Sequence, residues 1–270
     1  MKFGMCNEFC EEWNWESVCE LAARAGYDGV EIAPFTLGSS VPEISTHQRD
    51  AIRKMAAQNG LEIVGLHWLL SRTEGMHMNH PDDEVRRRTA DYLRAEIELC
   101  ADLGGDRMIV GSPEQRNVPE GETYEATWDR SVELFKNLAR HAGPRGITLC
   151  IEPLAPNECN FIQTAAEARR LVEAVDHPAF QMMLDVKAMC SENKPIPDII
   201  RSSAQYLEHF HANDANLRGP GFGDTDFEPI AEALDEVGYD DWVSVEVFDF
   251  SDGPETIATE SLRYLHEVFE

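Results

Sequence analysis

Four acidic or imidazole side chains each stand where a short apolar run of the sequence ends. Glu152 follows Ile147–Ile151, and three similar runs end at Asp185, His211 and Glu246. Short, β-rich runs bounded by Gly and Pro are typical of buried strands. A charge at the end of a buried strand is costly unless a partner or a metal compensates it. Carboxylates and imidazoles are also ligands that proteins use for divalent cations.

The elements that must position these residues alternate between strand and helix eight times along the chain. Strands are expected at residues 2–6, 29–32, 61–67, 107–110, 147–152, 181–185, 207–211 and 242–246, and helices at 14–25, 42–59, 81–103, 122–141, 164–175, 196–203, 226–237 and 255–269. Such alternation predicts a parallel sheet with helical crossovers. A (β/α)8 barrel typically needs about 250 residues. We therefore expect one α/β domain, a TIM barrel, over residues 1–270.

The longest irregular stretches all follow strands, at residues 68–80, 111–121, 153–163, 186–195 and 212–225. In a (β/α)8 barrel these loops line the mouth where active sites are built, and the strand ends converge there. Glu152, Asp185, His211 and Glu246 are therefore expected in one pocket. Any one of them alone is as readily explained by a helix cap or an ion pair, but four in successive strands favour a metal. The oxygen-rich set suits Mn2+, with Mg2+ or Co2+ as alternatives.

The charge of the chain excludes several classes of partner. It carries 50 acidic and 23 basic residues, a net charge of −27, and five of the basic residues are Lys. Nucleic acids and anionic membranes are polyanions, so neither is an expected partner. No apolar run approaches the roughly 20 residues that span a bilayer. The seven scattered cysteines include no Cys-x-x-Cys pair, which favours reduced thiols and a cytoplasmic protein.

Several stretches together resemble the xylose-isomerase-like TIM barrels, the sugar phosphate isomerase/epimerase superfamily, and within it the ketose 3-epimerases of the tagatose and psicose type. The stretches are Gly26–Ile32, Gly65–Trp68, Ile151–Leu154, Leu184–Met189, His209–Asp214, Gly221–Phe227 and Val245–Val247. They follow the family's order over nearly the whole chain. They are specific for the superfamily and weak for the substrate.

The resemblance implies one divalent ion bound by Glu152, Asp185, His211 and Glu246. It further implies that Glu152 and Glu246 are the catalytic proton-transfer pair. A carbon acid next to a ketone is too weak for a carboxylate alone, whereas a chelated cation polarises the carbonyl and stabilises an enediolate. One glutamate then removes a proton and the other returns one. The expected activity is a sugar isomerase or epimerase acting on a small sugar or polyol ketone.

Four further residues are candidates for substrate binding. His67 ends the third expected strand, Glu158 lies in the loop after Glu152, and Arg218 lies in the Gly-rich loop after the seventh strand. Glu158 and Arg218 resemble substrate-facing residues of the ketose epimerases. The family usually carries His three residues after the ligand Asp, where this chain has Ala188 with Lys187 beside it. We expect Lys187 to hold a carboxylate or phosphate of the substrate, to stabilise developing oxyanion charge, or to be a surface lysine.

Other activities in the same barrel remain open. A lyase or dehydratase of the inosose or 3-keto-glycoside type would use the same enolate and expel a β leaving group. Endonuclease IV shares the barrel, but it needs more ligands for three zinc ions and a surface that binds DNA. A non-catalytic sugar-binding protein would need the paired glutamates broken. Relatives in the family are often dimers or tetramers, so a homo-oligomer is also expected.

Overall fold

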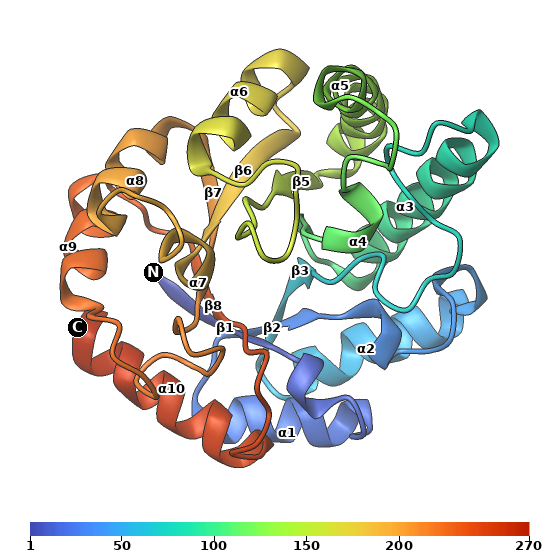
Figure 1. Cartoon of the computed structure of the whole chain (residues 1–270). Coiled ribbons are helices and arrows are strands. Elements are labelled where there is room, and N and C mark those ends of the chain that lie inside the picture. Colours follow the sequence, from blue (N-terminus) through green and yellow to red (C-terminus); the bar gives the residue numbers. More distant parts are fainter. Residues whose placement is uncertain (270) are drawn as a thin grey trace.

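Eight parallel strands hydrogen-bond in chain order and close into a barrel, because β1 pairs with β2 on one side and with β8 on the other. The computed structural model describes residues 1–269. Figure 1 looks along the barrel, with the strands at the centre and the helices in a ring around them. This is the predicted (β/α)8 barrel, and the expected fold class is confirmed.

The strands fall where the sequence predicts them, within one or two residues. They are β1 (Lys2–Cys6), β2 (Gly29–Ile32), β3 (Glu62–Leu66), β4 (Arg107–Val110), β5 (Thr148–Ile151), β6 (Phe180–Asp185), β7 (Leu207–Ala212) and β8 (Trp242–Val245). The helices are α1 (Trp15–Ala25), α2 (Thr46–Gln58), α3 (Asp83–Leu103), α4 (Pro113–Arg116), α5 (Tyr124–Ala142), α6 (Ala165–Val175), α7 (Val186–Met189), α8 (Ile196–Ser203), α9 (Glu228–Glu236) and α10 (Pro254–Phe269).

The second helix begins later than predicted. A helix was expected from residue 42, but Val41–Glu43 forms a separate 3-10 turn and α2 starts after Ser45. The reason is a capping box: the Ser45 hydroxyl accepts from the N–H of Gln48, and the Gln48 side chain accepts from the N–H of Ser45. Reciprocal bonds of this kind satisfy two backbone donors that the helix leaves free, and so fix its first turn.

Two of the stretches expected to be irregular contain short helices. Pro113–Arg116 forms α4 after β4, and Val186–Met189 forms α7 directly after β6. The α7 helix starts there because Oδ1 of Asp185 accepts from the N–H of Ala188 at 2.7 Å. Asp185 is therefore at once the last residue of a strand and the cap of a helix, which fixes its carboxylate at the barrel mouth.

Alternation along the strands separates the barrel interior from the layer under the helices. Cys150 packs with Ile109 and Met183 in a small cluster of its own, whereas its neighbours Leu149 and Ile151 belong to the main hydrophobic core. Successive side chains of a strand point to opposite faces of the sheet. Glu152 and Asp185 each lie two residues after a member of this inner cluster, Cys150 and Met183, and therefore also point into the barrel.

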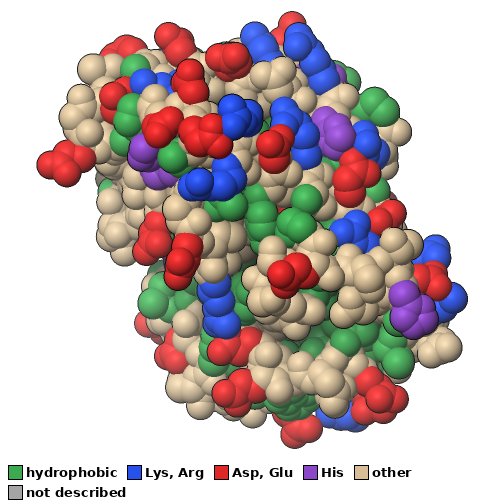
Figure 2. All heavy atoms as spheres, turned by 90° about the vertical axis from the view of Figure 1, so that its right-hand side faces the viewer, with side chains coloured by type: hydrophobic (Ala, Val, Ile, Leu, Met, Phe, Trp, Pro, Cys, Tyr) green, Lys and Arg blue, Asp and Glu red, His purple; other side chains and the backbone are tan. Residues whose placement is uncertain are grey.

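Acidic and basic side chains are interspersed on the face that carries α3, as Figure 2 shows. Along α3, Arg86, Arg87 and Arg94 each pair with an acidic residue three positions earlier. Pairs at this spacing lie on the same side of a helix.

Among residues 1–269, no helix has the length and apolarity needed to cross a bilayer.

Candidate active site

The four predicted metal ligands meet at the carboxyl ends of β5 to β8. Each of Glu152, Asp185, His211 and Glu246 offers one ligand atom, and these atoms all lie within 4.8 Å of one another. The register of β6 and β7 places Asp185 directly beside His211. All four residues are at most 5% exposed. The structure therefore brings the predicted set together in one buried cluster.

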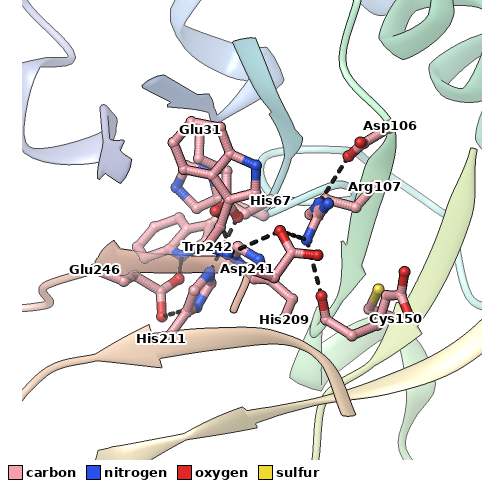
Figure 3. A network of polar contacts seen from close by, with 12 residues as sticks. Glu31, His67, Asp106, Arg107, Cys150, His209, His211, Asp241, Trp242 and Glu246 are labelled. Carbon is pink, nitrogen blue, oxygen red and sulfur yellow. Dashed lines mark hydrogen bonds and ion pairs between the residues drawn. The ribbon is translucent and has the colours of Figure 1, made fainter. Parts of the chain in front are cut away.

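His211 lies between two carboxylates, as Figure 3 shows. Its Nδ1 is 3.0 Å from Oε2 of Glu246, and its Nε2 is 3.0 Å from Oε1 of Glu31 on β2. The other oxygen of Glu31 lies 2.8 Å from Nε2 of His209. A carboxylate accepts hydrogen bonds, so both ring nitrogens of His211 face acceptors, with Glu31 at Nε2 and Glu246 at Nδ1, on the side of the cluster.

The pKa values in this chain of contacts follow from burial and charge. Burial opposes ionisation of Glu31, but His209 and His211 outweigh it and hold the pKa of the carboxyl well below its usual value. Burial likewise opposes the charge of His211, yet Glu31 and Glu246 raise the pKa of the imidazole. Glu31 and His211 therefore stabilise each other's charged forms in the inner half of the site.

The two glutamates expected to transfer protons have opposite pKa shifts. Burial raises the pKa of Glu152 well above its usual value, and the nearby carboxylates Glu246 and Asp185 add to that rise. For Glu246, burial is outweighed by His211, which attracts and hydrogen-bonds the carboxylate, so its pKa is lowered. Two carboxyl groups whose environments separate their pKa values are the arrangement that acid–base catalysis requires.

His67 lies beneath the cavity, where it contacts other protein groups. Its Nε2 is 2.9 Å from Oε2 of Glu8, its Nδ1 is 3.9 Å from Oε1 of Glu31, and the side chain is completely buried. Oε1 of Glu8 accepts from the N–H of Val247, the residue after Glu246. The imidazole predicted to meet substrate therefore connects the barrel interior to the backbone that carries Glu246.

Trp68 lies directly against Glu246. Its indole Nε1 donates to Oε1 of Glu246 at 2.7 Å, and its ring stacks on Phe248 with centroids 5.9 Å apart. The backbone at Trp68 has φ of +53°, in the left-handed region that side chains other than Gly rarely adopt. Uncommon backbone geometry of this kind is held by its surroundings and clusters at active sites.

Lys187 and Glu158 form a pair beside the cluster. Nζ of Lys187 lies 2.7 Å from Oε1 of Glu158 and 3.7 Å from the centroid of the Phe248 ring. Burial opposes the charge of Lys187, but Asp185 and Glu158 outweigh it and raise its pKa. Lys187 is thus a buried ammonium, and the alternative of a surface lysine is wrong.

Arg218 is engaged elsewhere. Its Nε donates to Oδ2 of Asp252 at 2.7 Å, and its guanidinium lies 4.8 Å from the centroid of the Phe222 ring. Among the described residues, the side chains that line the cavity include Glu158 but do not include Arg218, Lys187 or His67. Of the four predicted substrate-binding residues, the structure therefore places one on the cavity wall.

The cavity itself has a volume of about 320 Å³, within the range typical of sites for small molecules. It is lined by Trp68, Ser71, Arg72, Ile109, Gly111, Ser112, Pro113, Glu114, Gln115, Glu152, Leu154, Glu158, Glu246 and Phe248. Both glutamates of the expected pair reach it. At Gly111 a Cβ atom would lie 2.3 Å from Oε2 of Glu152, so only glycine leaves that carboxylate its position.

The donor set fits a hard divalent cation. Glu152, Asp185 and Glu246 bring three carboxylates together, and Nδ1 of His211 faces the same point. Burial, and after it Coulomb repulsion from Glu246 and Asp185, raises the pKa of Glu152, and a cation would offset both effects. Carboxylate oxygens with one imidazole suit Mn2+ or Mg2+. The outer contacts of His211 and Asp185 to Glu31 and Asn213 support ligands in the usual way.

Sequence reasoning missed the residues that support the ligands. Glu31 is a charge between the apolar Val30 and Ile32 in a buried strand, and that misplaced charge was the available signal. His209 shares the inner face with His211 because the two are two residues apart in β7. Glu8 lies in the one-turn helix η1 (Glu8–Cys10), where nothing in its neighbourhood marks it as buried.

Comparison with known proteins agrees with this geometry. The family model for the xylose isomerase-like TIM barrel matches residues 19–268. A D-psicose 3-epimerase of Ruminiclostridium cellulolyticum is 30% identical over 257 residues, covering 92% of this chain and 84% of the relative. A D-psicose 3-epimerase of Agrobacterium fabrum is 28% identical over 92% of this chain and 85% of its own length.

A solved structure is similar over its whole length. The D-psicose 3-epimerase of Clostridium cellulolyticum, crystallised with D-tagatose, superposes with a TM-score of 0.88 at 26% identity and covers 100% of both chains. The family model, the relatives and the barrel agree. The chain belongs to the xylose isomerase-like TIM barrel family and is an enzyme of the sugar isomerase and epimerase kind.

Proposed function

We propose that this protein is a divalent-metal-dependent ketose epimerase or isomerase that moves a proton on the carbon next to a carbonyl, through an enediolate. The observation that carries the proposal is the position of Glu152 and Glu246: both belong to the buried ligand cluster and both line the cavity. Proton donor and acceptor would thus sit where a chelated sugar must lie.

Glu152, Asp185, His211 and Glu246 would hold the cation. A cation bound there, with Mn2+ expected first, would polarise the substrate carbonyl and stabilise the negative charge that develops on its oxygen. Glu31 fixes the imidazole of His211 from behind, and the N–H of Ala188 fixes the carboxylate of Asp185. These contacts leave the ligand atoms little freedom, and such preorganisation is what a metal site needs.

Glu246 and Glu152 would share the proton transfer. Trp68 donates to Oε1 of Glu246, which orients the carboxylate and favours its ionised form, ready to accept a proton. Glu152 approaches the cavity from β5, three strands away around the barrel. Removal of a proton by one and return by the other inverts the carbon, and a well-placed acid–base group contributes about 100-fold to 10,000-fold in rate.

The substrate class follows from the cavity and from the relatives. The relatives are named D-psicose 3-epimerases, and one was crystallised with D-tagatose. Arg72 is the sole cationic side chain among the described residues of the cavity wall, and it pairs with Glu11. We therefore infer a small ketose or related polyol ketone without phosphate.

The test is solvent deuterium exchange. The Mn2+-loaded protein is incubated in D2O with D-psicose, D-tagatose, D-fructose, keto-inositols and 3-keto-glycosides, and NMR locates any carbon that gains deuterium. We expect exchange at the carbon next to the carbonyl of one ketose. Glu246→Gln and Glu152→Gln should each lower the exchange rate by about 100-fold or more.

A remote variant controls for general damage. Glu96→Gln alters a buried carboxyl in α3, outside the cavity, and should leave exchange unchanged. Exchange at the parental rate in Glu246→Gln would refute the two-glutamate mechanism. An unsaturated ketone, detected by its near-ultraviolet absorbance, would show the lyase reaction instead of epimerisation.

A further inference from the structure

The backbone around Lys187 is fixed on both sides of the residue. Its own N–H donates to Oδ1 of Asn213 at 2.8 Å. The N–H of the next residue, Ala188, donates to Oδ1 of Asp185, the residue that caps α7. The side chain is 6% exposed. Burying a lysine loses side-chain entropy and hydration, so a lysine held this firmly must be compensated by its partners.

The ammonium of Lys187 is already committed to protein groups. It donates to Oε1 of Glu158 at 2.7 Å and lies 3.7 Å above the centre of the Phe248 ring. Both Glu158 and Phe248 line the cavity, whereas Lys187 does not, so the ammonium lies behind the wall that these two form. A substrate phosphate or carboxylate would have to displace Glu158 to reach it.

The contact with Lys187 fixes which hydrogen bonds Glu158 can still accept. One oxygen is bonded by Lys187 and the other accepts from the N–H of Ala155 at 3.3 Å. An ionised carboxylate donates nothing and has about four acceptor positions, so capacity remains on the side that faces the cavity. The substrate atom that meets Glu158 must therefore carry a proton to donate, as a hydroxyl does.

We propose that Lys187 is a positioning residue that holds Glu158 on the cavity wall as a fixed acceptor, which makes the pair a specificity element for a polyol hydroxyl. Lys187 does not touch the substrate. It acts through Glu158. The side chain of Ala188 is a methyl group and cannot form a hydrogen bond, so the Lys187–Glu158 pair takes the place of a hydrogen-bonding side chain at that position. This inference rests on the proposed function, because it concerns how the same cavity selects its ketose.

The experiment measures hydroxyl discrimination. The ketose of the panel that reacts best is compared with a series of deoxy ketoses, each of which lacks one hydroxyl. For each sugar, KM is measured with the Mn2+-loaded protein, and Kd is measured by calorimetry on the same protein. In the parent one deoxy sugar should bind at least about tenfold more weakly than the complete ketose, because a partly buried carboxylate acceptor loses its donor. Lys187→Met should lose most of that preference, with KM changing more than kcat.

Four variants separate positioning from general damage. Glu158→Gln should lose the same preference, and the double variant should lose no more than the more affected single variant, because the two act as one unit. Lys187→Arg keeps a cation and should retain part of the preference. Lys194→Met removes an exposed lysine of the following loop and should change nothing.

The Mn2+ affinity of Lys187→Met is an independent test of whether the pocket keeps its shape. Lys187 lies close enough to Asp185 and Glu152 to interact with their charges, so removal of its ammonium should leave Mn2+ binding equal or tighter. A pocket that had merely lost its shape would bind Mn2+ more weakly. If Lys187→Met does not fold, Glu158→Gln carries the same test, since it keeps the lysine and alters only the acceptor.

The outcomes distinguish the two proposals. Full hydroxyl discrimination in both Lys187→Met and Glu158→Gln would overturn the positioning role, whatever the enzyme catalyses. Binding of ketoses with Lys187-dependent discrimination, but without deuterium exchange in the parent, would refute the proposed function and leave the positioning role standing.

Discussion

Oε1 of Glu31 lies 3.0 Å from Nε2 of His211, while Nδ1 of the same imidazole lies 3.0 Å from Glu246. The contact to Glu31 occupies Nε2, so Nδ1, on the Glu246 side, is the nitrogen that a bound cation would meet. Second contacts of this kind set the orientation and tautomer of a histidine ligand, and their loss costs metal affinity. We therefore expect Glu31 to support the proposed metal site without touching the metal.

Glu31→Gln should weaken Mn2+ binding by about 10-fold to 100-fold. A glutamine has one acceptor oxygen, so it cannot accept from both His209 and His211 as Glu31 does. Titration calorimetry with Mn2+ measures the affinity, and 15N NMR of the metal-free protein reports the protonation of both ring nitrogens of His211. Glu96→Gln is the matched buried control, and parental affinity in Glu31→Gln would contradict this role.

Trp68→Phe should lower kcat by about tenfold with a smaller change in KM, because a hydrogen bond to a charged group is lost. The phenyl ring keeps the stacking on Phe248 but cannot donate to Glu246. Trp15→Phe is the control, since the indole of Trp15 donates to the carbonyl of Ile52 in α2 and its loss should leave kcat unchanged. Equal kcat in Trp68→Phe and the parent would remove Trp68 from the mechanism.

Gly111→Ala should abolish most activity while the barrel remains folded. The added methyl would lie 2.3 Å from Oε2 of Glu152, so the carboxylate must move away from the other ligands. Gly38→Ala is the control, because the nearest atom to its added methyl is 3.9 Å away and its φ is not positive. We expect weaker Mn2+ binding and at least about 100-fold slower exchange in Gly111→Ala alone.

Glu96→Leu should stabilise the protein most at alkaline pH. Glu96 is completely buried in α3, and among residues 1–269 neither of its oxygens has a hydrogen-bond partner. Burial raises the pKa of this carboxyl well above its usual value of 4.5. The folded chain therefore keeps a proton that the unfolded chain releases above pH 4.5, and stability falls as the pH rises from there toward the folded pKa.

Chemical unfolding at several pH values measures this effect. The stability gain of Glu96→Leu over the parent should grow by about 1.4 kcal/mol per pH unit within that window. Below pH 4.5 both states of the parent bind the proton, so the gain there should be small and constant. A gain independent of pH between 5 and 8 would show that Glu96 ionises freely in the folded protein.

The sequence by itself determined the architecture. Eight apolar runs and their amphipathic partners specify the barrel, since periodicity and capping residues act locally and can be read without knowing what lies opposite. The strand-end residues Glu152, Asp185, His211 and Glu246 could be predicted to converge for the same reason: a closed parallel barrel gathers its strand ends at one mouth.

Only the tertiary structure decided what surrounds these residues. Glu31 and His211 are 180 residues apart in the chain, and Glu8 and His67 are 59 apart. No local pattern encodes such pairs, because a side-chain contact depends on strand register, rotamer and burial together. For the same reason Lys187 lies behind Glu158 and Arg218 pairs with Asp252, although the sequence places both in loops at the mouth of the barrel.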